Sequence, residues 1–209
     1  MSVSAILLAA GQSRRMGAFK PLLPFGGRTV VEACVDNLSA AGVREIIVVV
    51  GHRGADVRAQ LARRPVRFAS NEEAGSEMGV SVARGVEQVS ADERAVLVAL
   101  VDQPAVGPET IRRVIAAHER AGARLVVPEH AGRGGHPVLV DLAYRAELLS
   151  LVPGEGLRAL LARHAAEVRR VPVASPYVTR DMDTWADYRA LHEELFHAPP
   201  PEPTAGGTQ

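Results

Sequence analysis

Residues 3–20 read VSAILLAAGQSRRMGAFK, and this stretch decides the fold. Its first part, Val3–Ala9, is a short apolar run, and runs of the same kind recur at Glu45–Val50 and at 95–101. Strands of this composition are buried on both faces, as in a parallel sheet covered by helices. The second part, residues 10–20, combines glycines with cations, so we expect a loop that lies at the carboxyl end of the first strand and meets a ligand there.

The rest of the chain repeats this alternation of strand and helix. Further strands are predicted at 66–69, 124–127, 136–140 and 168–173, and helical patterns cover 29–41, 54–63, 78–89, 108–121, 141–150, 155–165 and 184–196. The order β–α–β predicts one α/β domain: a Rossmann-like, doubly wound, mostly parallel sheet with helices on both faces. In the first helix Val30, Cys34 and Leu38 form one apolar stripe, so Cys34 is interpreted as a buried hydrophobe and not a reactive thiol.

Length and composition narrow the class of protein. The 209 residues suit a single domain over 1–196, followed by a proline- and glycine-rich tail over 197–209 that we expect to be disordered. The formal net charge is zero and no basic block occurs, so we expect no nucleic-acid partner. A single cysteine allows no disulfide within the chain. The N-terminal apolar run has about six residues, too few to span a bilayer, and we expect a cytoplasmic protein with no membrane partner.

The loop after the first strand carries three cations beside its glycines. Arg14, Arg15 and Lys20 lie close to Gly11 and Gly17 in the sequence. Glycines let the backbone approach a ligand, and several cations together suit a polyphosphate. The dinucleotide fingerprint G-x-G-x-x-G and the Walker A loop are both absent. The alternative is a surface loop whose arginines are merely solvated.

Two acidic positions predict a metal site. Asp102 follows the buried strand at 95–101, where a carboxylate is costly unless a cation compensates its charge. Mg²⁺ binds one or two carboxylates together with phosphate oxygens, so it is the predicted cofactor. The alternative for Asp102 is a helix cap. Asp181 and Asp183 are two residues apart and would face the same side of an extended segment, with Thr184 and Asp187 as a capping box for the last helix.

Two glycine-containing segments predict contacts to a substrate. Residues 71–81, NEEAGSEMGVS, lead into a helix, and Asn71, Gly75 and Ser81 can hold a base or a phosphate there. Gly135 and His136 stand at the start of a strand, where a histidine is either functional or structural.

Five motifs occur in the chain in a characteristic order: LAAGxSxRMGxxKPLLP, Asn…GxxxxxS, DQP, GHPV and DxDTxxDY. In this order they resemble the MobA-like NTP transferases, and most closely the MocA-type molybdenum cofactor cytidylyltransferases. The resemblance covers residues 5–196. It implies that the domain is a nucleotidyltransferase, which moves a nucleoside monophosphate from an NTP to the terminal phosphate of molybdopterin and releases pyrophosphate. Client molybdoenzymes are the further partners that it implies.

The resemblance also assigns roles. It implies that Gly11, Arg15 and Lys20 hold the triphosphate and that Asp102 and Asp183 bind Mg²⁺, with Lys20, Arg15 and Asp102 as the catalytic groups. The residues expected to contact the nucleotide are Leu8, Ala9, Ala10, Gly11, Arg14, Lys20, Asn71, Gly75 and Ser81. The residues expected to contact the acceptor are Gly135, His136 and Glu155, although Gly154-Glu155-Gly156 stands where the family often has Gly-Asp-x-Gly-Ala.

Ala10 bears on the identity of the nucleotide. In the families that the chain resembles, Leu-Ala-Gly-Gly accompanies guanylyl transfer and Leu-Ala-Ala-Gly cytidylyl transfer, so CTP is the preferred substrate. A methyl group at Ala10 can narrow the base pocket against a purine. Two alternatives stay open: a guanylyltransferase or a nucleotidyltransferase for another small phosphorylated acceptor, and a non-catalytic protein that binds and delivers a nucleotide or pterin.

Overall fold

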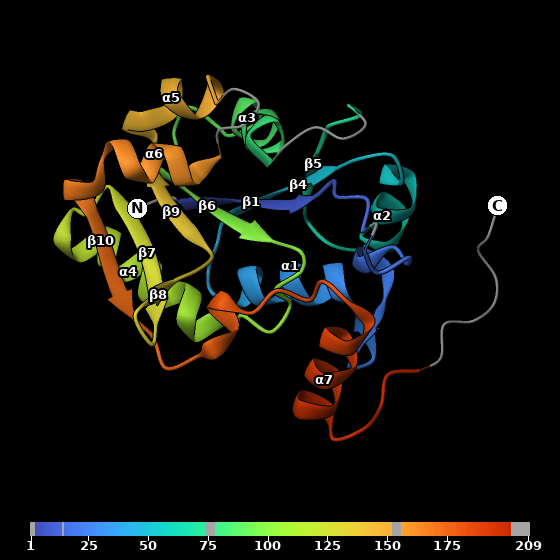
Figure 1. Cartoon of the computed structure of the whole chain (residues 1–209). Coiled ribbons are helices and arrows are strands. Elements are labelled where there is room, and N and C mark those ends of the chain that lie inside the picture. Colours follow the sequence, from blue (N-terminus) through green and yellow to red (C-terminus); the bar gives the residue numbers. More distant parts are fainter. Residues whose placement is uncertain (1–2, 14, 74–77, 152–155, 202–209) are drawn as a thin grey trace.

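The computed structural model describes residues 3–13, 15–73, 78–151 and 156–201. A mixed sheet runs through the centre of the molecule in the order β10-β7-β9-β6-β1-β4-β5 (Figure 1). Four neighbouring strands, β6, β1, β4 and β5, are parallel. β9 lies between β6 and β7 and is antiparallel to both, whereas β10 is parallel to β7. The expected Rossmann-like, mostly parallel sheet is therefore confirmed, with β9 as its reversed strand.

The bounds of the elements agree closely with the predicted ones. The main strands are β1 (Val3–Ala9), β4 (Glu45–Val50), β5 (Arg67–Ser70), β6 (Ala95–Leu100), β7 (Leu125–His130), β9 (Val138–Asp141) and β10 (Val168–Pro172). The α-helices of the described residues are α1 (Val30–Ala40), α2 (Gly54–Gln60), α3 (Met78–Glu87), α4 (Pro108–Ala121), α5 (Arg145–Leu149), α6 (Leu157–Arg163) and α7 (Trp185–Phe196).

Three differences have local causes. β9 begins at Val138 and not at His136, because Pro137 has no N–H to donate to a strand ladder. The helix expected over 141–150 is a 3₁₀-helix, η2 (Leu142–Tyr144), followed by the short α5. The hairpin of β2 (Pro24–Phe25) and β3 (Arg28–Thr29) was not predicted. Gly26 and Gly27, with φ of 58° and 80°, form its two-residue turn.

The sheet carries a hydrophobic core on each face, because successive residues of a strand point to opposite sides. In β1, Ala5 and Leu7 belong to one core and Ile6 and Leu8 to the other. Helices α1, α4 and α7 lie on one side of the sheet in Figure 1, and α3, α5 and α6 on the other. Cys34 of α1 is buried in the first of these cores, as predicted, and burial raises the pKa of its thiol.

Two helices begin at capping boxes, of which only the one at Thr184 was predicted. Thr29 and Glu32 form a capping box at the start of α1, and Thr184 and Asp187 form one at the start of α7. Such caps satisfy backbone N–H groups that the helix cannot pair, each stabilising the fold by about 1 kcal/mol. The cap of α7 also fixes the backbone of Asp183, whose N–H donates to Asp187 Oδ2 over 3.2 Å.

Residues 197–201 follow α7, and His192 Nδ1 lies 2.8 Å from the carbonyl oxygen of Ala198. The rest of the predicted tail, 202–209, lies outside the described residues. Within the described part of the chain, none of the helices combines the length and the apolar character needed to cross a membrane.

Candidate active site

Backbone hydrogen bonds within the loop after β1 form a tight turn. The carbonyl oxygen of Ser13 accepts hydrogen bonds from Met16 and Gly17, at 3.0 and 3.2 Å. Ser13 and Gly17 both have positive φ, 51° and 68°, and glycine adopts this conformation without strain. Ser13 Oγ accepts from the backbone N–H of Lys20 over 3.2 Å. The turn thus returns the chain to the sheet and places Lys20 at the start of the 3₁₀-helix η1 (Lys20–Leu22).

Lys20 joins the two predicted metal-binding carboxylates. Its Nζ lies 2.7 Å from Asp183 Oδ1 and 3.7 Å from Asp102 Oδ2, and its side chain is only 9% exposed. Arg15 reaches the other oxygen of Asp183, with 2.7 Å between NH1 and Oδ2, while 74% of its side chain stays exposed. The structure therefore brings together residues from the loop after β1, the end of β6 and the segment before α7.

Asp102 is the second carboxylate of this cluster, and 26% of its side chain is exposed. Burial raises the pKa of its carboxyl group to about 6, although Lys20 opposes the shift and Asp181 and Asp183 add to it. Asp102 Oδ1 is buried and finds no hydrogen-bond partner among the described residues. The carbonyl oxygen of Asp102 accepts from the backbone N–H of Met182 over 2.9 Å, which ties the end of β6 to the segment that carries Asp183.

Asp181 has a different partner from Asp183. Gln103 Nε2 donates to Asp181 Oδ1 over 2.7 Å and to the carbonyl oxygen of Val178 over 3.3 Å. Asp181 and Asp183, which we expected to face the same side, thus have different partners: Asp181 contacts Gln103, whereas Asp183 contacts Lys20 and Arg15. Sequence reasoning missed Gln103, although its place directly after Asp102 was a usable signal.

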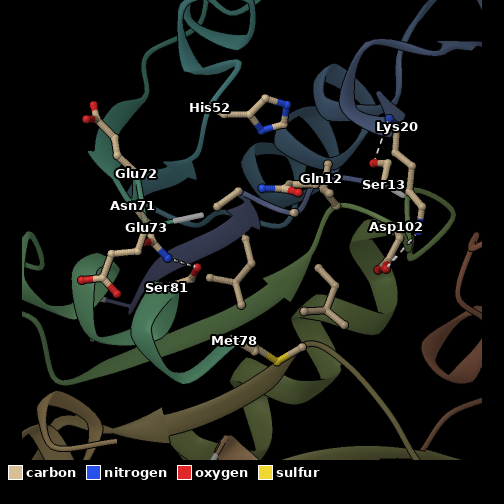
Figure 2. Close-up of a pocket in the computed structure, with 15 residues that line it drawn as sticks. Gln12, Ser13, Lys20, His52, Asn71, Glu72, Glu73, Met78, Ser81 and Asp102 are labelled. Atoms are coloured by element: carbon tan, nitrogen blue, oxygen red, sulfur yellow. Dashed lines mark hydrogen bonds and ion pairs between the residues drawn. The ribbon is translucent and has the colours of Figure 1, made fainter. Parts of the chain in front are cut away.

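A cavity of about 420 Å³ opens beside this cluster, at the carboxyl ends of β1, β4, β5 and β6. Figure 2 shows its lining, with Lys20 and Asp102 on one side, Asn71 and Ser81 on another, and His52 across from Met78. Asn71 Nδ2 donates to Ser81 Oγ over 2.7 Å. The predicted nucleotide-binding residues that line the cavity are Leu8, Ala10, Gly11, Lys20, Asn71 and Ser81.

Two glycines shape the cavity in different ways. A Cβ atom at Gly11 would meet no protein atom within 4 Å, so the backbone there is open to a ligand. A Cβ atom at Gly51 would lie 2.6 Å from the carbonyl oxygen of Ala10. The glycine at 51 therefore allows the ends of β1 and β4 to pack closely, and this packing holds Ala10 in place.

A second cavity, of about 600 Å³, contains the predicted acceptor residues Gly135 and His136. Burial lowers the pKa of His136, against the opposing charge of Asp181. A Cβ atom at Gly135 would collide with the carbonyl oxygen of Val178, so this glycine is also required by packing. The rest of the wall is mostly apolar and includes two guanidinium groups. Met78 lines this cavity as well as the first one. The other lining residues are Val127, Gly134, Val138, Gly156, Leu157, Arg158, Leu161, Ala162, Ala165, Val168 and Arg170.

Some predicted residues lie elsewhere. Ala9 is 1% exposed in a hydrophobic core and does not line the first cavity, because its side chain points to the opposite face of β1 from Leu8. Arg14, Gly75 and Glu155 lie outside the described residues. Sequence reasoning missed other residues of the first cavity, which are Gln12, Ser13, His52, Glu72, Glu73, Met78, Leu100 and Val101. Position at a strand end was the available signal for His52, which follows β4 after Gly51.

The carboxylates of Asp102 and Asp183 fit a divalent cation that takes most of its ligands from water and from a bound phosphate. Among the described residues, no three His, Cys, Asp or Glu side chains are grouped so that they could hold a metal ion. Asp102 and Asp183 are two carboxylates gathered at one ammonium group, and Asp102 Oδ1 lacks a partner. Mg²⁺ and Mn²⁺ favour such oxygen ligands, and Mg²⁺ is commonly held by one or two carboxylates with water and phosphate oxygens.

Comparison with known proteins shows the family. The MobA-like NTP transferase domain matches residues 5–168. The chain belongs to this family of nucleotidyltransferases. Its relatives include the nicotine blue oxidoreductase of Paenarthrobacter nicotinovorans, which is 31% identical over 189 residues, covering 87% of this chain and 92% of the relative. It also matches bifunctional GlmU proteins, but spans only 26% of the one from Symbiobacterium thermophilum.

Solved structures of this family share the fold. Rv0371c from Mycobacterium tuberculosis H37Rv is 30% identical with a TM-score of 0.84, covering 92% of this chain and 98% of that protein. Rv0371c has also been solved in complex with manganese. A nucleotidyl transferase from Methanothermobacter is 29% identical with a TM-score of 0.80, covering 92% and 97% of the two chains. The manganese complex is consistent with the use of a divalent metal in this family.

Proposed function

We propose that this nucleotidyltransferase moves CMP from CTP to the terminal phosphate of a molybdopterin-type acceptor and releases pyrophosphate. The observation that carries the proposal is the position of Lys20 between Asp102 and Asp183, at the edge of a cavity built from strand ends. The cavity would take the nucleotide. The second cavity, lined by Gly135 and His136, would take the acceptor.

Each part of the site has a role in this reaction. Lys20 and Arg15 would hold the triphosphate, since both are cations of the loop after β1. The side chain of Arg15 is exposed enough to turn toward a ligand. The open backbone at Gly11 would approach the phosphates. Asp102 and Asp183 would hold Mg²⁺, which when bound neutralises charge on the phosphates. The acceptor phosphate is already an anion at neutral pH, so positioning and charge stabilisation suffice, with no strong general base.

The preference for CTP rests on Ala10. Ala10 lines the cavity, and its backbone lies close against Gly51 at the end of the neighbouring strand, so we expect little room for the strand end to shift for a larger base. A purine would therefore meet a methyl group that a pyrimidine avoids. GTP remains the alternative nucleotide, and another small phosphorylated molecule the alternative acceptor.

The test is a screen of nucleotides against acceptors with Mg²⁺ or Mn²⁺, with release of pyrophosphate as the readout. We expect release from CTP when molybdopterin is supplied, and much less from GTP. If no pair of nucleotide and acceptor gives pyrophosphate, the proposal of nucleotidyl transfer is contradicted. Tight pterin binding that persists in a variant lacking both Asp102 and Asp183 would then favour a delivery protein.

A second candidate is an oxidoreductase. It is favoured by the extent of the likeness to nicotine blue oxidoreductase, which covers 87% of this chain and 92% of that protein. The same screen, run with a nicotinamide reductant and nicotine blue in place of NTP and acceptor, separates the candidates. Oxidation of the reductant without pyrophosphate release under any condition would favour this one.

A further inference from the structure

Met78 is the residue that the two cavities share. It lines the cavity that would hold the nucleotide and also the cavity that would hold the acceptor. Its side chain is 45% exposed, and among the described residues only Leu149 and Phe196 are other large hydrophobic side chains with comparable exposure. Because both cavities are lined by Met78, a ligand in either one could cover part of this apolar side chain.

The backbone beneath Met78 is held firmly. Met78 is the first residue of α3, and the residues that follow on the inner face of this helix are buried, including Val82 and Val86. Gly85 allows the helix to approach the sheet so closely that a Cβ atom there would lie 2.5 Å from Ile6 Cγ2. Ser81 is held by Asn71. Met78 therefore stands at the exposed start of a well-packed helix, and changing its side chain should not disturb the core.

We infer that Met78 is a positioning residue, which contacts the nucleotide on one side and the acceptor on the other and so sets their mutual placement. The inference rests on the proposed function, because it assumes a ligand in each cavity. A methionine suits this place, since three rotatable bonds and a polarisable sulfur let one side chain adapt to two surfaces. A misplacement of about 1 Å can slow a reaction on the order of 10²-fold, so a loosened wall between the ligands should slow transfer.

The experiment compares Met78→Ala with Met78→Leu, which keeps most of the apolar contact. Leu149→Ala is the matched control, because Leu149 is 41% exposed but lines neither cavity. Two probes report on the cavities separately: CTP with Mg²⁺, measured by calorimetry, and pterin-6-carboxylate, measured by its fluorescence. Thermal unfolding of each variant checks that the fold is unchanged.

We expect Met78→Ala to weaken both probes by about tenfold, the loss that removing roughly two buried methylene groups produces. KM should rise for both substrates, and Met78→Leu and Leu149→Ala should stay within about twofold of the wild-type protein. A purely structural role would lower the unfolding temperature without this pattern. Unchanged binding of both probes, or weakening of one alone, would overturn the inference while leaving the proposed function intact. A wild-type protein that binds neither probe would contradict both.

Discussion

Lys20 Nζ lies 2.7 Å from Asp183 Oδ1, although the two residues are 163 positions apart in the chain. The contact joins the loop after the first strand to the segment before the last helix. Because only 9% of the Lys20 side chain is exposed, we expect that water cannot readily take its place between Asp183 and Asp102. The first prediction follows from this.

Lys20→Ala should lower kcat by on the order of 10²-fold or more, the effect of losing one preorganised charged donor. The measurement is the initial rate of pyrophosphate release at saturating nucleotide. Arg84→Ala is the control, because Arg84 forms only an exposed pair with Glu87 and lines neither cavity. A Lys20 variant as fast as the Arg84 variant would contradict the assigned role.

Removing either of the two carboxylates proposed to bind the metal should abolish the stabilisation that the metal gives. In the presence of CTP, Mg²⁺ or Mn²⁺ should raise the unfolding temperature of the wild-type protein, because binding to the folded state stabilises it. Asp102→Asn and Asp183→Asn should lose this increase. Asp181→Asn should keep it, since Asp181 is bonded to Gln103 and not to Lys20. Equal shifts in all three variants would argue against the proposed ligands.

Two glycine substitutions should fail in different ways. Gly11→Ala should leave the unfolding temperature nearly unchanged and weaken CTP binding, because the added methyl group meets no protein atom but enters the cavity wall. Gly51→Ala should lower stability by about 1–3 kcal/mol, since its methyl group would strike the carbonyl oxygen of Ala10. Calorimetric titration and thermal unfolding measure the two effects. Identical behaviour of the two variants would refute the distinction.

Ala10→Gly should relax the choice of base. Removal of one methyl group from a packed pocket changes discrimination by roughly 1–3 kcal/mol, so the ratio of kcat/KM for GTP to that for CTP should rise about tenfold or more. The ratio is measured with both nucleotides under one set of conditions. A ratio that does not change would mean that Ala10 does not select the base.

The cluster around Arg64 should make the fold sensitive to acid. Hydrogen bonds from Arg64 hold the pKa of Asp36 below its usual value, and Arg64 NH1 also lies 2.6 Å from Glu32 Oε1. A lowered carboxyl pKa contributes stability that is present above the unfolded pKa and is lost as the pH falls through the folded one. Arg64→Gln should therefore destabilise the protein at pH 7, and the difference from wild type should shrink below about pH 4, as denaturant titration can show.

Most of the fold could be predicted from the sequence because its strands are simple. Runs such as Val3–Ala9 are apolar throughout, so burial on both faces was readable from composition. The reversed direction of β9 was not readable. Its residues, Val138–Asp141, look like those of any short buried strand, and only its pairing with β6 and β7 reveals the direction. The 3₁₀-helix η2 was likewise not predicted, because the pattern of apolar residues over 141–150 favoured one longer α-helix.

Residues of the candidate site could be predicted where a charged side chain stands in an unusual place in the sequence. Asp102 after a buried strand and Lys20 beside glycines both gave such signals. Met78 gave none, because a methionine at the start of a helix is expected to pack in a core. The wall that the two cavities share and the hydrogen bond from Gln103 to Asp181 both depend on tertiary structure. No spacing of residues along the chain predicts either of them.

The hydrogen bond from Met182 to Asp102 ties the candidate metal site to a part of the chain beyond the family match. That match ends at Val168, whereas Asp183 and α7 follow this point. A chain shortened at residue 168 would keep the described residues that line the first cavity and would lose Asp183 and most of β10. It would also lose Met182, Tyr188 and Leu191 from one of the hydrophobic cores. The residues that match the family therefore do not suffice for the proposed metal site, and any shortened form of the protein has to keep the segment between β10 and α7.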